Sequence, residues 1–366
     1  MLERYGHGGD LRTAEECFGL PSSSFLDYSS NMNPLGPPDA VREVLAQYTA
    51  LIDRYPDPVA RRLCTMLSQR HAIEEGAILI GNGAAELIDL VVRATRPEAA
   101  AVAVPCFSEY GDAIRKTGAA LYEGPLYETE QFRLNKRWVE ESLKRSNAKL
   151  YMVGSPNNPT GALIEPARVY ELLDSGATVV VDEAFMDFVP EEERYSLVRE
   201  AAQNRNLYVV RSMTKFYSIP GIRLGYIIGH PDSLAELSRL QVPWSVNSLA
   251  QSIGEAVLGD EAFAQASLRW LQEERPWLSR ELEALGFRVY PGETNYLLLR
   301  LPDGCGLSSA ELQRAMGAKG VLIRDGSHFP GLNGRYIRVA VKLREQNARL
   351  VDALRTSMSM SEQEGK

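Results

Sequence analysis

The sequence lacks paired cysteines, long apolar runs and an excess of basic residues. Its four cysteines, at positions 17, 64, 106 and 305, are scattered with no pair at metal-binding spacing, so we expect reduced thiols and no metal site. No run of about 18 apolar residues occurs, which argues against a membrane span. The formal net charge of −8 disfavours nucleic acid and anionic membrane as main partners. The first seven residues have no signal-peptide pattern, and we therefore expect a cytoplasmic protein.

The composition and the apolar pattern predict an α/β fold. The chain has 366 residues, of which 45% are apolar and 24% charged, which suits a large domain with a smaller partner. The middle of the chain alternates helix-like stretches with short apolar runs at residues 77–80, 101–104, 150–153, 178–181, 207–210 and 225–228. Near-continuous apolar runs are typical of strands buried on both faces of a mostly parallel sheet.

The pattern changes near residue 263, where we predict a second unit. A long helical stretch, 263–285, precedes short strand-like runs at 287–290, 295–299, 321–324 and 335–340, then a final helix over about 345–358 with a frayed tail. This order is typical of an α+β domain. The first 36 residues are rich in Gly, Ser, Asn and Pro and predict an extended arm. The predicted division is an arm over 1–36 that joins the small domain, a large domain over 37–262 and a small domain over 263–366.

Four features stand in one order along the chain, and the first three come directly after or at the end of predicted strands. They are the segment Ser155–Gly161 (SPNNPTG), Asp182 after a valine-rich run, Ser212-Met213-Thr214-Lys215, and Arg223 eight residues after that lysine. Each alone has an ordinary explanation, such as a turn, a helix cap or a surface lysine. Ligands of open α/β sheets bind at the carboxyl ends of the strands, so the joint pattern predicts one binding site there.

These residues have the chemistry that pyridoxal 5′-phosphate (PLP) requires around its ring. PLP needs an amine to bind covalently, which Lys215 supplies. Its pyridine nitrogen stays protonated beside a buried carboxylate, and Asp182 can serve. Asn158 is placed as the donor to the ring oxygen O3′, and Phe107 can stack on the ring face.

The phosphate of PLP needs a different set of donors. A dianion is bound well by hydroxyls, a guanidinium and the backbone amides at a helix start. The hydroxyls and the guanidinium would come from Ser212, Thr214 and Arg223. The amides would come from the glycine turn that opens a predicted helix, at Gly83, Ala84 and Ala85.

With these motifs the chain closely resembles fold-type-I PLP enzymes, in the branch that holds histidinol-phosphate aminotransferases and threonine-phosphate decarboxylases. The resemblance covers essentially the whole chain and implies the same roles for the residues named above. It also implies a large domain with a seven-stranded, mostly parallel sheet and a smaller α+β domain. By the same resemblance, Arg338 holds the substrate α-carboxylate, and Tyr55 reaches the cofactor phosphate of a neighbouring subunit. We therefore expect a homodimer with shared sites.

Within this branch the decarboxylases are the closer match. The opening His7-Gly8-Gly9-Asp10 and the loop 29–36 (SSNMNPLG) are similar to theirs. Phe185 stands where aminotransferases usually have Tyr, which removes a donor to O3′. The resemblance implies that Arg324, Asn31 and His7, with the neighbouring Gly8, bind the phosphate of the substrate, next to Asn158 and Arg338.

The expected reaction is PLP-dependent decarboxylation of L-threonine O-3-phosphate to (R)-1-amino-2-propanol O-2-phosphate. In the family that the chain resembles, this product supplies the aminopropanol linker of cobalamin. L-serine O-phosphate differs by one methyl group and is a close variant. The alternative is an aminotransferase acting on histidinol phosphate or an aromatic amino acid. A PLP-binding regulator is a remote alternative, because no stretch before Gly36 or after Met358 could fold as a basic DNA-binding module.

Overall fold

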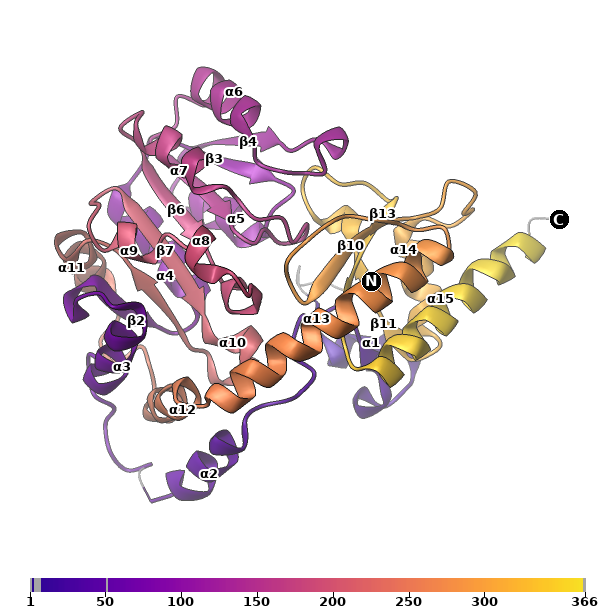
Figure 1. The fold of residues 1–366 in the computed structure, drawn as a ribbon, viewed down its shortest axis with the longest axis horizontal. Coiled ribbons are helices and arrows are strands. Elements are labelled where there is room, and N and C mark those ends of the chain that lie inside the picture. The colour runs from indigo at the N-terminus through magenta and orange to yellow at the C-terminus, as the bar shows by residue number, and fades with distance from the viewer. Residues whose placement is uncertain (1, 3–7, 51, 365–366) are drawn as a thin grey trace.

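The structure is a computed structural model that describes residues 2, 8–50 and 52–364. The chain forms two units, which we call the large unit and the small unit, on either side of the long helix α13 (Glu261–Ala284) (Figure 1). In the part of the chain that the structure describes, no helix is long and apolar enough to cross a membrane.

The large unit is built on a seven-stranded sheet. Its strand order is β2-β8-β7-β6-β5-β3-β4, and β8 is the one antiparallel strand among these seven. The bounds are β2 (Ile78–Gly81), β3 (Ala99–Val104), β4 (Ala120–Pro125), β5 (Leu150–Gly154), β6 (Thr178–Asp182), β7 (Leu207–Ser212) and β8 (Gly225–Ile228). The prediction of a mostly parallel seven-stranded sheet is confirmed. Edge strand β4 coincides with no predicted run because most of its residues are exposed or half-exposed.

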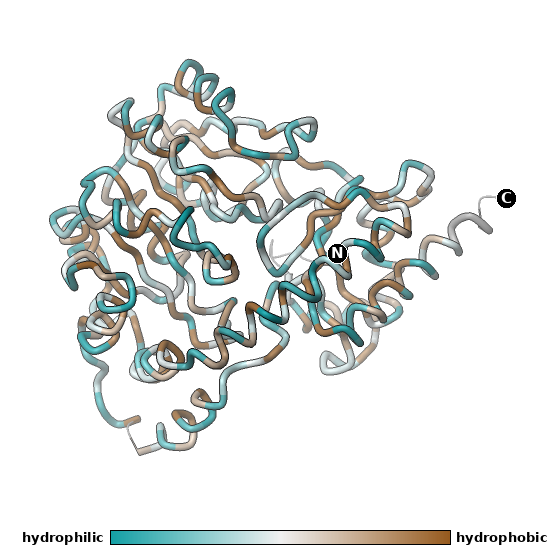
Figure 2. The backbone as a smooth tube through the Cα atoms, in the orientation of Figure 1, coloured by the Kyte–Doolittle hydropathy of each residue, from teal (hydrophilic) through white to brown (hydrophobic). Residues whose placement is uncertain are grey.

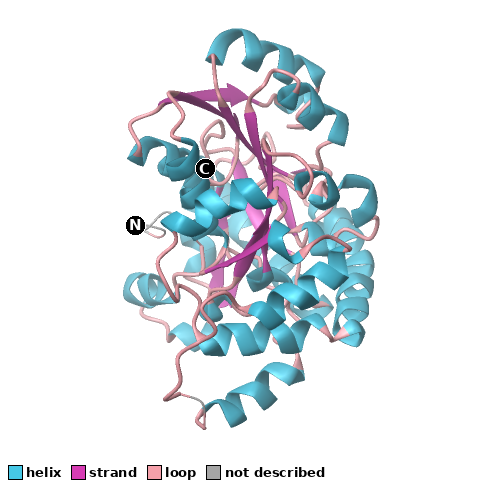
Figure 3. Cartoon of the chain, turned by 90° about the vertical axis from the view of Figure 1, so that its left-hand side faces the viewer, coloured by secondary structure: helices cyan, strands magenta, loops and turns pink. Residues whose placement is uncertain are grey.

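Successive residues of the central strands point into two different cores. In β6, Val179 and Val181 belong to one apolar cluster, whereas Val180 belongs to the other. Helices cover both faces of the sheet (Figure 3), and apolar stretches of the chain run through the interior of the large unit (Figure 2). Burial on both faces explains why these strands have no polar alternation.

The helices of the large unit connect and cover these strands. Their bounds are α2 (Asp39–Tyr48), α3 (Arg61–His71), α4 (Ala84–Thr95), α5 (Ser108–Lys116), α6 (Lys136–Ser146), α7 (Pro166–Leu173), α8 (Glu192–Tyr195), α9 (Val198–Ala201), α10 (Met213–Phe216), α11 (Pro231–Leu240) and α12 (Ser248–Leu258). Short 3-10 helices occur in both units of the chain. They are η1 (Ser22–Ser24), η2 (Glu75–Ala77), η3 (Glu128–Glu130), η4 (Met186–Phe188), η5 (Pro220–Ile222) and η6 (Gly326–His328).

The small unit combines the two ends of the chain. Its antiparallel sheet has the order β12-β13-β10-β9, with β9 (Arg288–Val289), β10 (Tyr296–Arg300), β12 (Arg324–Asp325) and β13 (Tyr336–Ala340). A second, two-stranded sheet pairs β1 (Leu26–Asp27) with β11 (Val321–Leu322) in parallel. The remaining helices are α1 (Leu11–Phe18), α14 (Ser309–Gly317) and α15 (Arg344–Glu364). The predicted unit limits at residues 36 and 262 stay predictions.

Two details of the small unit differ from the sequence-based expectation. The single strand predicted over 321–324 is two strands, because the chain changes partner from β1 to β13 at Ile323. The sequence predicts a frayed tail from Met358 onward. This prediction is wrong as far as Glu364, because α15 continues to that residue. No Gly or Pro interrupts the chain between these two residues, and Gly365 follows, so the backbone can remain helical until that point.

The strand register brings the predicted motifs to one edge of the large sheet. Asp182 at the end of β6 is level with Gly154 of β5 and Val210 of β7. The antiparallel strand β8 starts at the same edge, where Gly225 pairs with Ser212 and with Gly81. Arg223 therefore stands beside the ends of the parallel strands although it precedes its own strand.

Candidate active site

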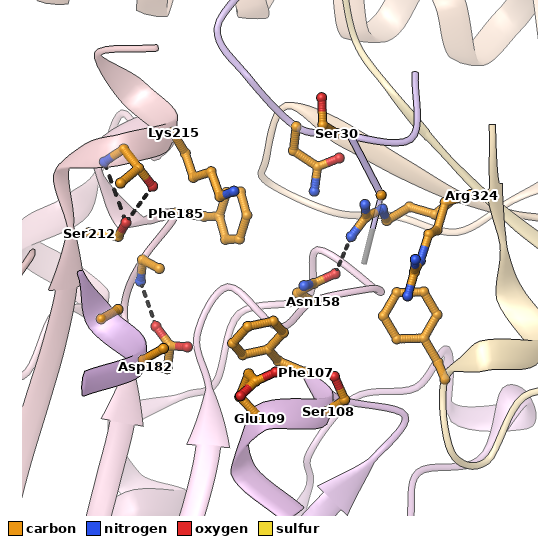
Figure 4. A pocket seen from close by; sticks show the side chains of 18 of the residues that line it. Ser30, Phe107, Ser108, Glu109, Asn158, Asp182, Phe185, Ser212, Lys215 and Arg324 are labelled. Carbon is orange, nitrogen blue, oxygen red and sulfur yellow. Dashed lines mark hydrogen bonds between the residues drawn. The ribbon is translucent and has the colours of Figure 1, made fainter. Parts of the chain in front are cut away.

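A cavity of about 450 Å³ lies at this sheet edge, between the large and small units. In Figure 4, Lys215 and Arg324 enter it from opposite sides. Most of the predicted site residues line it: Gly8, Asn31, Ala84, Ala85, Phe107, Asn158, Asp182, Phe185, Ser212, Thr214, Lys215, Arg223, Arg324 and Arg338.

Lys215 lies in the first turn after β7, on the short helix α10. Ser212 caps this helix: its Oγ lies 3.4 Å from the Thr214 nitrogen, which donates to it, and 2.8 Å from Thr214 Oγ1. Burial lowers the pKa of the Lys215 ammonium to about 8, and the positive charges of Arg338 and Arg223 act in the same direction. An amine with this pKa is partly neutral near pH 8 and can act as a nucleophile.

Asp182 is a buried carboxylate held by two donors. Tyr110 donates its hydroxyl hydrogen to Oδ2 at 2.6 Å, and the Ala184 nitrogen donates to Oδ1 at 2.9 Å. Burial raises the pKa of Asp182, whereas both hydrogen bonds and nearby Lys215 oppose that rise. A buried carboxylate is stabilised by a cation at contact distance, and a protonated pyridine ring would provide one.

A cradle of donor groups forms where β2, β7 and β8 meet. Gly83 precedes α4 with a φ of 81°, a conformation that L side chains rarely adopt. A Cβ at Gly83 would collide with the guanidinium of Arg223. The start of α4 therefore lies beside this guanidinium, and its first residues line the same cavity as Ser212 and Thr214. Backbone amides at a helix start, hydroxyls and a guanidinium together suit a phosphate dianion.

Asn158 and Phe107 complete the surroundings expected for the cofactor ring. Arg338 Nη1 donates to Asn158 Oδ1 at 2.5 Å. An arginine has only donors, so this contact uses the amide oxygen of Asn158 and leaves its amide nitrogen to donate to another group. Phe107 lines the cavity and packs edge-to-face on Tyr110, with ring centroids 5.7 Å apart.

The side of the cavity formed by the small unit contains two neighbouring arginines. Arg324 of β12 and Arg338 of β13 are direct cross-strand partners, and their side chains are 4% and 5% exposed. Arg338 Nη2 also donates to the carbonyl oxygen of Ser29 at 2.6 Å. With Lys215 and Arg223, these residues place four basic side chains around the cavity of a chain whose formal net charge is −8. The cavity therefore suits a small anion with more than one negative group.

The N-terminal segment contributes Gly8 and Asn31 to the cavity. A Cβ at Gly8 would collide with the carbonyl oxygen of Ser29, so the backbones approach closely there. Asn31 is buried, and its Oδ1 has no hydrogen-bond partner among the residues that the structure describes. An unsatisfied buried polar atom beside a cavity is consistent with a ligand contact. The predicted contact of His7 lies outside the described residues.

Two further predicted residues have different surroundings. Phe185 lines the cavity and packs edge-to-face on Tyr296, with centroids 4.9 Å apart. Tyr55 does not line the cavity: its side chain is 84% exposed, and its ring lies 5.2 Å from that of Trp244. The predicted role of Tyr55 concerns a neighbouring subunit and stays a prediction.

Several cavity residues were not expected from the sequence. Tyr110 follows Phe107 by three positions, the spacing that places residues on one side of a helix, so this pattern could have indicated it. Phe329 and His328 follow β12 in a short segment without a distinctive pattern. Across the described parts of the chain, no group of three or more His, Cys, Asp or Glu could hold a metal ion.

The geometry agrees with comparisons to known proteins. The model of the family "Aminotransferase class I and II" matches residues 23–354. The chain is 38% identical to a threonine-phosphate decarboxylase of Salmonella typhimurium over 96% of both chains. It is 33% identical to a histidinol-phosphate aminotransferase of Roseiflexus castenholzii, over 97% of this chain and 95% of the other.

A solved structure supports the same assignment. The L-threonine-O-3-phosphate decarboxylase of Porphyromonas gingivalis superimposes with a TM-score of 0.77 at 28% identity, covering 90% of this chain and 98% of that one. The family model matches most of this chain, and the relatives match along nearly all of it. The chain therefore belongs to the aminotransferase class I and II family.

Proposed function

We propose that this chain is a PLP-dependent decarboxylase that converts L-threonine O-3-phosphate to (R)-1-amino-2-propanol O-2-phosphate for cobalamin biosynthesis. The observation that best supports this proposal is that one cavity contains Lys215, Asp182 and the adjacent arginines Arg324 and Arg338. A substrate with both a carboxylate and a phosphate can use both guanidiniums. The 38% identity to a protein named threonine-phosphate decarboxylase supports the same reaction.

The residues of the cavity fit PLP. Lys215 would bind it covalently, Asp182 would hold the proton on the pyridine nitrogen, and the cradle beside Gly83 would bind its phosphate. Bound PLP supplies an electron-accepting ring that stabilises negative charge developing at the substrate Cα. Tyr110 and the Ala184 amide keep the Asp182 carboxylate in place for this task.

The arginines and the lysine would then direct the reaction. Arg338 would bind the substrate carboxylate, and Arg324 would bind its phosphate. Anchoring at two points selects which bond at Cα is aligned for cleavage, and remote binding energy of the phosphate contributes to this alignment. After carbon dioxide leaves, Lys215 would deliver a proton to Cα, for which a pKa near 8 is well suited.

An aminotransferase is the second candidate, because histidinol-phosphate aminotransferases are also among the relatives. It would need a 2-oxo acid as the second substrate. Phe185 argues against it, since a phenyl ring cannot donate to O3′ as the tyrosine usual in aminotransferases does. Serine phosphate remains a candidate substrate, because a single methyl group changes binding by only about 1 kcal/mol.

We further propose a homodimer in the cytoplasm. Six exposed apolar side chains, which we call the apolar patch, come from two segments of the chain: Leu45, Ile52, Tyr55, Val59, Val242 and Trp244. Exposed apolar side chains of this kind, among them the neighbouring rings of Tyr55 and Trp244, are typical of a subunit interface. In such a dimer Tyr55 would reach the cofactor phosphate of the partner subunit. The four cysteines are free thiols, in keeping with a reducing compartment.

The decisive experiment is turnover without an oxo acid. Purified protein is incubated with PLP and L-threonine O-3-phosphate, with L-serine O-phosphate in parallel, while carbon dioxide and the phosphorylated amine are measured. Carbon dioxide release that is absent in Lys215→Ala supports the decarboxylase, and the ratio of the two rates identifies the preferred substrate. Amino transfer to 2-oxoglutarate from histidinol phosphate, without carbon dioxide release, would instead establish the aminotransferase.

A further inference from the structure

The ring of Phe329 contacts both arginines of the proposed substrate site. The guanidinium carbon of Arg324 lies over this ring, 5.1 Å from its centroid, and that of Arg338 lies 5.6 Å from the same centroid. Phe329 is 4% exposed and lines the cavity. Neither cofactor binding nor proton transfer requires this aromatic ring.

The strand register explains why the two guanidiniums need such a contact. Arg324 and Arg338 are paired directly across β12 and β13, so their side chains leave the sheet on the same face. Residues in this relation have Cβ atoms about 4.5–5.5 Å apart, and like charges there repel each other. The face of an aromatic ring is negative and attracts a guanidinium within about 6 Å. The buried ring of Phe329 therefore attracts both guanidiniums and restricts the position of each.

Arg338 is held by contacts other than the Phe329 ring, and Phe329 contacts Arg324 as well. The Arg338 guanidinium donates to Asn158 Oδ1 and to the Ser29 carbonyl oxygen and lies 5.3 Å from the centroid of the Tyr296 ring. These contacts hold it relative to the large unit and the N-terminal segment. The shared contact with Phe329 then sets how far the Arg324 guanidinium stands from that fixed point.

We propose that Phe329 determines substrate specificity by fixing the separation between the carboxylate-binding and phosphate-binding arginines. The inference rests on the assignment of Arg338 to the carboxylate and Arg324 to the phosphate made under the proposed function. In threonine phosphate and serine phosphate alike, two carbons and one oxygen separate the carboxyl carbon from phosphorus. Phe329 therefore selects for this spacing and against phosphorylated acids with a shorter or longer separation, without discriminating between these two substrates.

The spacing can be tested on the holoenzyme with phosphorylated acids that lack an amine and so do not react. The series is 2-phosphoglycolate, 3-phosphoglycerate and 4-phosphoerythronate, which adds one carbon between the two anionic groups at each step. Titration calorimetry should give a dissociation constant for 3-phosphoglycerate about tenfold lower than for either neighbour, the usual effect of one misplaced methylene. Equal affinities across the series would overturn the proposal.

Two variants test whether the aromatic ring of Phe329, and not the overall polarity of the site, causes the preference for 3-phosphoglycerate. Phe329→Leu removes the aromatic face, and the preference for 3-phosphoglycerate should fall to about threefold or less. Phe329→Tyr keeps the ring and should keep the preference of about tenfold. A Leu variant with native circular dichroism and an unchanged preference would refute the role of the ring. Should it fail to fold, Phe329→Met, which also lacks the ring, replaces it.

The same measurements distinguish this inference from the proposed reaction. Selective binding of 3-phosphoglycerate without carbon dioxide release from threonine phosphate would retain the role of Phe329 and reject the decarboxylase. Carbon dioxide release with no selectivity by length would retain the reaction and reject the role of Phe329.

Discussion

At the scale of single residues, the proposed chemistry depends on two groups whose pKa values are shifted by burial. The ammonium of Lys215 loses a proton more easily than an exposed lysine, and the carboxyl of Asp182 holds one more strongly than an exposed aspartate. Both pKa shifts arise because the two side chains are buried, and burial disfavours the charged form of each. The same burial makes the hydrogen bonds of these groups energetically important.

The pKa of Lys215 predicts how fast the cofactor-free protein takes up PLP. Only the neutral amine reacts, so the rate should rise about tenfold per pH unit below pH 8 and level off above it. The measurement is stopped-flow absorbance of PLP binding between pH 6 and 10. A rate that keeps rising to pH 10 would mean an ordinary lysine, and Lys215→Ala serves as the control without covalent binding.

Tyr110 should stabilise the protein through its hydrogen bond to Asp182. Tyr110→Phe removes a buried donor to a carboxylate, which should lower the free energy of unfolding by about 1.5–3 kcal/mol. Urea unfolding of the cofactor-free protein at pH 8 measures this loss. Tyr122→Phe on edge strand β4 makes the same chemical change at a partly exposed ring and should stay within about 0.5 kcal/mol. Equal effects of both variants would contradict the assignment.

At the scale of elements, the site is formed by the turns and short helices at the strand ends. The turn between β2 and α4 allows the proposed phosphate site to be tested by one substitution, because a Cβ at Gly83 would collide with Arg223. Gly83→Ala should displace the guanidinium and weaken PLP binding about tenfold or more through lost charge-assisted hydrogen bonds. Gly118→Ala is the matched control, since Gly118 has a φ of 79° but no atom within 4 Å of an added Cβ.

Both variants place an alanine at a similar positive φ, 81° at Gly83 and 79° at Gly118, but only the Cβ at Gly83 would collide with Arg223. Fluorescence titration with PLP measures both dissociation constants. Equal weakening by Gly83→Ala and Gly118→Ala would show that strain alone, and not the position of Arg223, determines cofactor affinity.

A buried ion cluster joins the ends of β6 and β7. Arg211 is fully buried and lies 2.9 Å from Glu183 and 2.6 Å from Glu192. Arg211→Met would leave buried carboxylates without their cation and should cost about 3–5 kcal/mol in the free energy of unfolding. Arg239→Met breaks an exposed pair with Glu236, also 2.6 Å long, and should cost about 0–1 kcal/mol. Chemical denaturation of both variants measures the difference, and similar losses would contradict the role of burial.

At the scale of the whole molecule, the apolar patch predicts association of two chains. Val242 is 68% exposed, so Val242→Asp would place a charge in the proposed interface and should shift the protein towards monomers. Sedimentation velocity measures the change, and PLP affinity should fall with it because Tyr55 would leave the partner's site. Leu343→Asp, at another exposed apolar residue, should leave the oligomeric state unchanged. A wild-type protein that is monomeric at all concentrations would reject the dimer.

The sequence alone predicts the large unit and the cofactor side of the site. Apolar runs predict the buried strands, and ligand groups that come directly after those strands must gather where parallel strands end, as Asp182, Ser212 and Lys215 do. Strand β4 escaped prediction because an exposed edge strand has no continuous apolar run. The resemblance to a family, not any local pattern, indicated Arg324 and Arg338.

The assembly of the substrate side depends on tertiary contacts. Its parts come from distant segments: Gly8 and Asn31 from the N-terminal region, and Phe329 from the C-terminal region, brought together where β1 pairs with β11. Local periodicity predicts a strand but not its partner, since pairing depends on contacts between residues hundreds of positions apart. The cross-strand register of Arg324 and Arg338, and the ring that contacts both, therefore emerge only in the folded chain.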